Sequence, residues 1–385
     1  MKDIQLNNVG PIKNANVQFG DLTILVGPQA SGKSIFLQLL KLLIDKNHIR
    51  KTLEQYGFPW KKDAGAISQL FFGTGMDKLW TEKSTIQYDS KKYDLDYLLV
   101  RQRQTSLDNA KERVFYIPAQ RVLSLENGWP RFFSGFDSSV PYVLRHYSET
   151  LRLFMDNGME KKEDVFPAKK RLKEPLLDAF TSAIYQGATI KLSTLQGRKQ
   201  FILQVGGSEL PFMTWSAGQK EFMPLLLSFY YLSPPSKVSK KGEFDVVVIE
   251  EPEMGLHPQA IQSILLEVMD LMSRGYQVII STHSPVFLEF AWAFKYLKES
   301  KTSSYKTLME LFDFSGGPPS LITMFKNAFS KEIKSYYFDR NNGGVNVTDI
   351  SSLDAGSENA SISEWGGLST FSTKAGELVS KSIEL

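Results

Sequence analysis

The sequence predicts an α/β protein with a mainly parallel core sheet, an antiparallel β portion and a helical inserted lobe. Three short apolar runs carry this prediction, because such runs are typical of strands buried on both faces. They are Leu22–Val26, Val246–Ile249 and Gln277–Ile280. A helical pattern follows the first run and another separates the second from the third. Strands that alternate with helices in this way form parallel sheets.

The other elements follow from shorter patterns and from turn residues. We expect further strands at 4–6, 17–19 and 114–117, helices at 34–44, 259–273 and within 140–187, and hairpins at 190–205 and 336–349. Residues 1–45 and 188–295 should form the core, 46–187 the inserted lobe, and 296–385 an extension of helix and hairpin with a Ser- and Gly-rich tail. The composition of 351–385 predicts partial disorder.

Composition excludes several classes of function. The 385 residues include no cysteine, so disulfides, thiolate metal sites and cysteine nucleophiles are excluded. The formal net charge is +3, which does not by itself indicate a nucleic-acid partner. No apolar run approaches the roughly 18–20 residues needed to cross a bilayer, and the N-terminus lacks the apolar core of a signal peptide. We therefore expect a soluble, cytoplasmic protein with no membrane partner.

A phosphate-binding loop follows the first buried run. The motif G-x-x-x-x-G-K-[ST] is matched by Gly27, Pro28, Gln29, Ala30, Ser31, Gly32, Lys33 and Ser34. The motif lies between a strand and a helix, where its backbone N–H groups and the helix dipole can hold a phosphate. Lys33 would reach the β- and γ-phosphates, and the Ser34 hydroxyl would bind Mg²⁺. An ordinary glycine turn would not also require the strand, the spacing, the lysine and the serine, so the pattern predicts binding of a nucleoside triphosphate with Mg²⁺.

Acidic residues end the second buried run, and a histidine follows the third. Glu250 and Glu251 come directly after Val246–Ile249, at the carboxyl end of a strand, where ligands bind in open α/β sheets. Glu250 is placed to hold Mg²⁺ through water, and Glu251 to polarise a water molecule for attack on the γ-phosphate. His283 is placed to contact the γ-phosphate or to orient that water. Solvated strand ends would explain each feature alone, but the phosphate loop favours a hydrolytic site.

The remaining histidines carry less information. His257 is expected to be a turn residue before a helix. His48 and His146 have no recognisable constellation around them in the sequence, and the spacing of the four histidines does not indicate a metal site.

Together these motifs resemble the ABC-type ATPase heads. The resemblance rests on GPQASGKS, WSAGQKE, VVVIEEPE, GLHP and STHSP, in that order, within residues 1 to 290. It implies that Ser216, Gly218 and Gln219 form a signature segment that contacts the γ-phosphate held by a second copy of the chain. It also implies that residues 253–258 lie at the seam between two heads, and that Gln120 or Arg121 senses the γ-phosphate.

Motif variants narrow the resemblance. The combination of EEPE, LHP and STHSP is similar to the OLD, RecF and SMC-like branch, whereas transporter heads usually carry LSGGQ and an Asp-Glu pair. The Glu-for-Asp change at Glu250 bears on Mg²⁺ affinity and not on the identity of the site. A stand-alone head of this size most resembles the ATPase components of bacterial anti-phage systems such as Septu, PARIS and retron-linked ATPases. That resemblance implies an ATPase that controls a separate effector, a nuclease or toxin, through head dimerisation.

Two other functions stay open at this point. A RecF- or SMC-like repair or recombination ATPase would clamp DNA across the head dimer, and the basic runs Lys169–Arg171 and Lys237–Lys241 would then contact it. Such runs are also common on solvated surfaces. A transporter motor is the third reading, and the motif variants argue against it.

Overall fold

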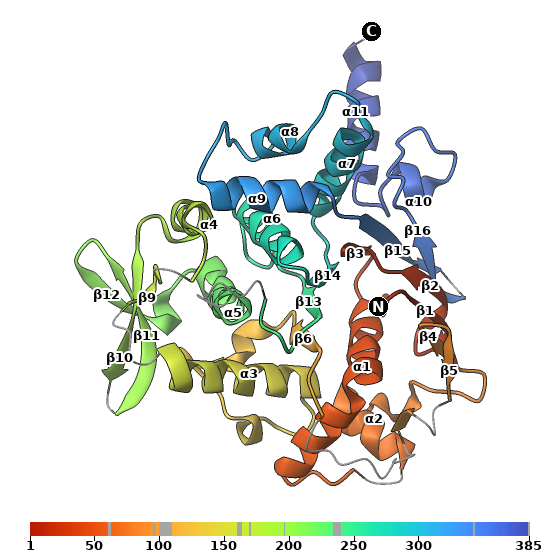
Figure 1. The fold of residues 1–385 in the computed structure, drawn as a ribbon. Coiled ribbons are helices and arrows are strands. Elements are labelled where there is room, and N and C mark those ends of the chain that lie inside the picture. The colour runs from red at the N-terminus through yellow and green to blue at the C-terminus, as the bar shows by residue number, and fades with distance from the viewer. Residues whose placement is uncertain are drawn as a thin grey trace.

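The computed structural model describes residues 1–60, 63–94, 98–99, 110–159, 164–168, 171–195, 197–233, 240–341 and 343–383. Figure 1 shows a central body in which helices surround a large sheet, and a smaller β lobe at the left, formed by β9 to β12. No helix within the described ranges is long and apolar enough to cross a membrane.

One ten-stranded sheet forms the centre of the protein. Its strand order is β5-β4-β1-β2-β16-β15-β3-β14-β13-β6. The strands are β1 Asp3–Val9, β2 Ile12–Gln18, β3 Leu22–Val26, β4 Thr85–Tyr88, β5 Lys91–Tyr93, β6 Val114–Ile117, β13 Val246–Glu250, β14 Gln277–Ser281, β15 Ile333–Asn341 and β16 Gly344–Asp349. The five neighbours β15, β3, β14, β13 and β6 run parallel, whereas β1, β2, β4 and β5 pair antiparallel. The predicted parallel core and antiparallel portion are therefore confirmed.

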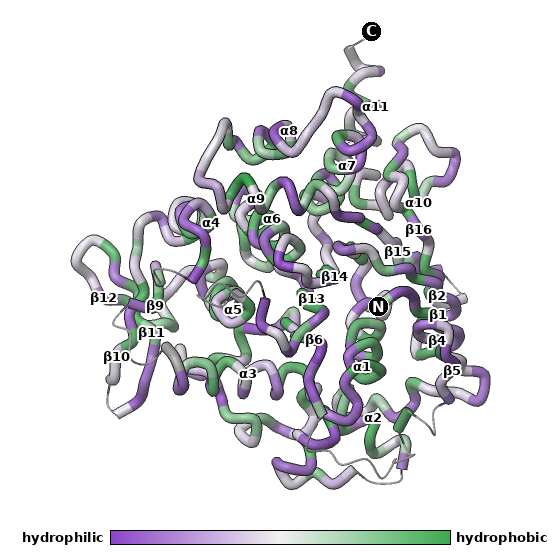
Figure 2. Tube along the Cα trace, in the orientation of Figure 1, coloured by the Kyte–Doolittle hydropathy of each residue, from purple (hydrophilic) through white to green (hydrophobic). Residues whose placement is uncertain are grey.

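Helices cover both faces of the parallel strands. The helices are α1 Lys33–Gln55, α2 Ala64–Phe72, α3 Tyr142–Phe154, α4 Glu174–Phe180, α5 Ala217–Leu232, α6 Pro258–Ser273, α7 Pro285–Glu299, α8 Tyr305–Glu310, α9 Pro319–Phe329, α10 Ala360–Ser363 and α11 Thr370–Ile383. Alternate residues of β13 point to two separate apolar clusters. Val246 and Val248 pack in the cluster that contains α1, while Val247 and Ile249 pack in the one that contains α5, α6 and α7. Figure 2 shows the apolar colouring of α1 and α5 on either side of β6 and β13.

A second, four-stranded sheet forms the β lobe. It consists of β9 Asp164–Phe166, β10 Thr189–Leu195, β11 Arg198–Val205 and β12 Ser208–Pro211, all antiparallel. The predicted hairpin at 190–205 is confirmed by the pairing of β10 with β11. A further small pair, β7 Leu125–Glu126 and β8 Trp129–Pro130, lies after β6.

The C-terminal part departs from expectation. The predicted hairpin is β15 and β16, but it joins the central sheet between β3 and β2 and does not stand apart from it. Residues 360–363 and 370–383 form α10 and α11, so the partial disorder predicted for 351–385 is wrong over these helices. Asn359 caps α10, because its side chain accepts the Ser361 N–H at 3.0 Å. The apolar residues of α11 follow a helical spacing that composition alone does not reveal, although Phe371, Leu378 and Val379 are exposed.

The three-part division of the chain stays a prediction, although strands from all three ranges meet in the central sheet. Of the basic runs, Lys169, Lys170 and residues 237–239 lie outside the described residues.

Candidate functional site

The predicted phosphate loop connects β3 to α1. Its backbone requires glycine at two points. Gly27 has φ of +148°, and a Cβ there would lie 2.7 Å from the carbonyl oxygen of Phe338 on β15. Gly32 has φ of +87°, and a Cβ there would lie 2.8 Å from a ring carbon of Pro11. The glycines therefore permit a curled loop packed closely against its neighbours, immediately before a helix N-terminus, which is the arrangement that binds phosphate in other proteins.

Lys33 lies inside the curve of this loop. Its Nζ donates to the carbonyl oxygens of Gly27 at 2.7 Å and Pro28 at 3.0 Å, and to Ser31 Oγ at 3.4 Å. Burial lowers the pKa of Lys33 from 10.5 to about 8, although Glu251, Glu253 and Glu250 oppose that shift. These three carboxylates therefore face the ammonium group. The phosphate loop and residues 251–255, here called the acidic turn, thus lie close enough to interact electrostatically.

Glu250 is the last residue of β13 and is buried. Burial raises the pKa of its carboxyl group, and the facing hydroxyls of Ser34 and Tyr116 and the N–H of Ala119 counteract this only in part. Its Oε2 accepts the Ala119 N–H at 3.3 Å, but its Oε1 has no hydrogen bond of ordinary geometry among the described residues. A buried carboxylate oxygen without a donor, beside the hydroxyl of Ser34, fits a cation ligand.

Glu251 and His283 approach each other at the ends of β13 and β14. Glu251 has φ of +44°, a conformation that costs energy in a residue with a side chain, and its N–H donates to the Ser281 carbonyl at 2.7 Å. The turn directs the Glu251 carboxylate towards His283, with Oε1 at 3.6 Å from His283 Nε2. Interaction with His283 is the main reason that the pKa of Glu251 falls below its usual value. Glu251 is therefore ionised at neutral pH and half-exposed, as a general base must be.

Glu253 has a role that the sequence did not reveal. Its Oε1 accepts from Thr282 Oγ1 at 2.7 Å and from the His283 N–H at 2.6 Å. The segment Thr282–Ser284, here called the histidine segment, is therefore tied to the turn that carries Glu251. The resemblance to ATPase heads placed residues 253–258 only at the seam between two heads. The feature of the sequence that could have indicated this role is the third acid of EEPE, Glu253.

Arg121 does not have the geometry of a phosphate sensor. Its side chain is 0% exposed, and its guanidinium donates to the carbonyl oxygens of Glu250 at 3.1 Å, Glu251 at 3.2 Å and Pro252 at 3.4 Å. Its Nε donates to the Glu221 carbonyl at 3.0 Å. Arg121 therefore holds the acidic turn from behind, because its donors are directed at the backbone. The sensor prediction stays open for Gln120, whose side chain is exposed.

The signature segment begins α5 with a capping box. Ser216 Oγ accepts the Gln219 N–H at 3.3 Å, and Gln219 Oε1 accepts the Ser216 N–H at 3.2 Å. Ser216 is exposed, and its own O–H is free to donate to another molecule. The segments that begin α5 and α1 are distinct, because the two helices pack in separate apolar clusters on opposite faces of the sheet (Figure 1).

Gly218 brings the signature segment against the acidic turn. A Cβ at Gly218 would lie 2.6 Å from the carbonyl oxygen of Gly255, which itself has φ of +70°. Two glycines thus allow direct backbone contact between the start of α5 and the turn that follows β13.

The other histidines divide into one confirmed and one wrong prediction. His257 is the N-cap of α6, and its Nδ1 accepts the Gln259 N–H at 3.4 Å, as expected for a turn residue before a helix. His48 and His146, however, are not isolated, because both lie against Glu112. No sequence pattern indicates this cluster, because its three members are far apart in the chain and meet only through the packing of α1, α3 and β6.

Comparison with known proteins gives matches over part of the chain. Residues 161–289 match a family model described as "AAA domain, putative AbiEii toxin, Type IV TA system". That segment contains the signature residues, Glu250, Glu251 and His283, but not the phosphate loop. The chain is also 30% identical over 181 residues to the Old nuclease of Escherichia phage P2. The match covers 44% of this chain and 29% of that protein.

Solved structures show weaker likenesses. An SMC head bound to the C-winged helix domain of ScpA aligns with 90% of this chain and 96% of that one, at 11% identity and a TM-score of 0.42. The SMC head domain from Thermotoga maritima aligns with 90% and 98%, at 13% identity and a TM-score of 0.34. A bacterial Atm1-family ABC exporter with ATP bound aligns with 75% and 36%, at 14% identity and a TM-score of 0.34. Scores at this level carry no argument about function.

Proposed function

We propose that the protein is an ABC-type ATPase whose active sites form between two copies of the chain. The observation that carries this proposal is the convergence of three neighbouring parallel strands. The strands β3, β14 and β13 end at one edge of the sheet. There the carboxylates of Glu250, Glu251 and Glu253 face Lys33 of the phosphate loop, and Glu253 holds the histidine segment beside them. The partial matches to an AAA domain and to the Old nuclease support the proposal.

ATP binding would begin at the phosphate loop. The Lys33 ammonium is charged at neutral pH and would exchange its loop carbonyls for phosphate oxygens, which are stronger acceptors. Ser34 and the unpartnered Oε1 of Glu250 would hold Mg²⁺. When bound, that ion neutralises charge on the β- and γ-phosphates.

Hydrolysis would then depend on the turn after β13. Glu251 orients a water molecule and accepts its proton, while His283 is near enough to share that proton or to donate towards the phosphate. Glu253 and Arg121 position this pair without contacting the nucleotide, because the first holds the histidine segment and the second holds the turn.

The signature segment would complete the site of the second copy. The Ser216 hydroxyl and the first N–H groups of α5 lie at a helix N-terminus, where a γ-phosphate is stabilised. The exposure of Ser216 supports contact between this segment and another molecule's nucleotide.

A mixing experiment tests this shared site. Ser216→Arg should leave ATP binding nearly intact and abolish hydrolysis, whereas Lys33→Ala should abolish binding. Mixing the two proteins should restore activity at one of the two composite sites of each heterodimer. If the mixture stays inactive although native mass spectrometry shows heterodimers, the shared site is refuted.

Glu251→Gln provides an independent test of the chemistry. We expect this variant to bind ATP, fail to turn it over and accumulate as a closed dimer, measurable by light scattering with and without ATP. Rapid turnover by this variant would remove Glu251 from the role of base.

We further propose that head closure controls a separate effector, a nuclease or toxin, in bacterial defence against phage. Hydrolysis yields only ADP and phosphate, so its useful output must be a change of shape acting on another molecule. Affinity purification from cells that express the neighbouring genes should recover a stoichiometric protein partner. Recovery of the chain alone, together with hydrolysis that duplex DNA stimulates and salt suppresses, would support the DNA clamp instead.

A further inference from the structure

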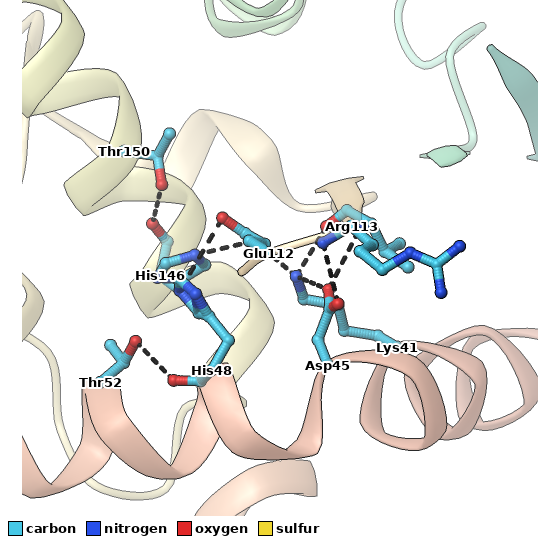
Figure 3. Close-up of polar contacts among 9 residues, drawn as sticks. Lys41, Asp45, His48, Thr52, Glu112, Arg113, His146 and Thr150 are labelled. Carbon is cyan, nitrogen blue, oxygen red and sulfur yellow. Dashed lines mark hydrogen bonds and ion pairs between the residues drawn. The ribbon is translucent and has the colours of Figure 1, made fainter. Parts of the chain in front are cut away.

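Two histidines and one glutamate converge away from the nucleotide site. His48 comes from α1, His146 from α3, and Glu112 from the segment just before β6 (Figure 3). His146 Nε2 lies 3.0 Å from Glu112 Oε1, and His48 Nε2 lies 3.9 Å from Glu112 Oε2. The candidate ligand atoms of the three residues all lie within 4.8 Å of one another.

The hydrogen bonds of this cluster are incomplete. At 3.9 Å the His48 contact is too long for a hydrogen bond. Both ring nitrogens of His48, and Nδ1 of His146, are shielded from solvent without a partner among the described residues. Buried polar atoms nearly always have a partner, so the cluster lacks a ligand or a donor that these side chains do not supply.

The charges around the cluster favour a cation. Lys41 Nζ contacts Asp45 Oδ2 at 2.7 Å and Glu112 Oε1 at 2.5 Å, and it also donates to the Val114 carbonyl at 2.6 Å. Asp45 thus balances the charge of Lys41, and the charge of Glu112 is left over if both imidazoles are neutral. Lys41 uses only Oε1, which fixes the carboxylate and leaves Oε2 directed towards His48 (Figure 3).

The spacing suits a metal ion with imidazole and carboxylate ligands. Tetrahedral ligands at about 2.0–2.2 Å from zinc lie about 3.4 Å from one another. The 3.9 Å from His48 Nε2 to Glu112 Oε2, the oxygen that Lys41 does not bind, is close to that value. The 3.0 Å contact of His146 Nε2 is with Oε1, so His146 would have to turn slightly from that oxygen to the ion. The ring of Tyr142 stacks on His146 at 5.1 Å and 11°, which limits how that ligand can turn.

We propose that His48, His146 and Glu112 bind one divalent transition-metal ion of the zinc type, with a fourth position open to water. The ion would join α1, which begins at the phosphate loop, to α3 and to the segment before β6. Two imidazoles with one carboxylate are a recurrent ligand set for zinc. The assignment is independent of ATP hydrolysis, because the nucleotide site uses none of these residues.

Metal titration of the full-length protein tests the site. Protein freed of metal by a chelator is titrated with ZnCl₂ in the presence of excess Mg²⁺. The Mg²⁺ occupies the carboxylates of the nucleotide site, so that Zn²⁺ does not bind there. We expect one Zn²⁺ per chain, with affinity at least about 100-fold weaker in His48→Gln and in His146→Gln, since even the loss of an outer partner of a ligand costs 10–100-fold. His257→Gln, which alters a helix cap elsewhere, is the matched control and should bind as the parent does.

A second measurement guards against misfolded variants. In the unaltered chain, Zn²⁺ at 100 times its dissociation constant should raise the ratio of folded to unfolded protein about 100-fold, and EDTA should reverse the effect. The proposal is overturned if the folded parent binds no Zn²⁺. It is also overturned if His146→Gln binds normally, or if His283→Gln alone removes binding, which would place the ion at the nucleotide site.

Discussion

Replacing Arg121 with methionine tests whether this side chain supports hydrolysis, by holding the acidic turn, in addition to stabilising the fold. The side chain is fully buried and donates to five backbone carbonyls, those of Ala119, Glu221, Glu250, Glu251 and Pro252. Methionine has a similar length but no donor, so Arg121→Met removes every one of these hydrogen bonds without opening a large cavity.

The expected loss of stability in Arg121→Met depends on two opposing contributions, the hydrogen bonds of the guanidinium and the free energy of burying its charge. Hydrogen bonds to a charged group contribute about 1.5–3 kcal/mol each, but burying the guanidinium opposes them. The loss is also partial, because the Glu251 carbonyl keeps the Met254 N–H at 3.2 Å. We therefore expect the free energy of unfolding to fall by about 3 kcal/mol. A displacement of Glu251 by about 1 Å should lower kcat about 100-fold.

Arg145 provides a matched control. It is also a fully buried arginine, but it lies on α3 and donates to the carbonyl of Leu70 at 2.7 Å. Arg145→Met should lower stability, since the guanidinium also stacks over Phe133 at 4.9 Å, but it should leave kcat per folded molecule unchanged. Urea unfolding and ATP hydrolysis, both on the folded fraction at one temperature, give the two quantities.

The reasoning fails if Arg121→Met unfolds at the urea midpoint of the parent chain. It also fails if the two arginine variants lose kcat equally, because Arg121 would then have no particular connection to Glu251.

Three further outcomes follow from single contacts. Because burial lowers the pKa of Lys33 to about 8 and bound phosphate must restore its charge, ATP binding above pH 8 takes up a proton, and affinity should fall by up to about tenfold per pH unit. Lys46→Met, which removes another lysine whose pKa is lowered to about 8, should leave that slope unchanged in calorimetric titrations. Glu253→Ala removes the acceptor that holds the histidine segment and should lower kcat about 10- to 100-fold with unchanged binding of a fluorescent ATP analogue; weaker binding with normal kcat would contradict this. Gly218→Ala places a Cβ 2.6 Å from a facing carbonyl oxygen and should destabilise by about 1–3 kcal/mol in urea unfolding, whereas Gly135→Ala, in open space, should change stability little.

Local backbone chemistry explains what the sequence could predict. The phosphate loop could be predicted because its backbone conformation requires glycine at Gly27 and Gly32. The sequence motif therefore reports the loop structure directly. Glu250, Glu251 and His283 could be predicted because the ends of parallel strands meet at one edge, and a run of buried residues marks where each strand ends.

Contacts that depend on tertiary packing could not be predicted. Arg121 looked like a phosphate ligand in sequence, yet it is buried behind the turn, and burial of one arginine leaves no periodic signal. Glu112 is separated from both His48 and His146 by intervening chain, and only the docking of α1 and α3 beside β6 brings them together. The neighbours of β15 could not be predicted either, because the chain reaches the position beside β3 only after the crossover through α7 to α9.

The contacts around the acidic turn also connect the proposed active sites of a dimer. Within one chain, Arg121 holds the start of α5 through the Glu221 carbonyl and the turn through the carbonyls of Glu250 to Pro252. Gly218 adds a backbone contact between the same two segments. If Ser216 of this chain binds the γ-phosphate held by the second copy, any shift of the start of α5 would therefore be passed to this chain's own Glu251. Because the backbones are in direct contact at Gly218 and Gly255, closure at one composite site should change the geometry of the other. We therefore expect hydrolysis in the dimer to be cooperative in ATP.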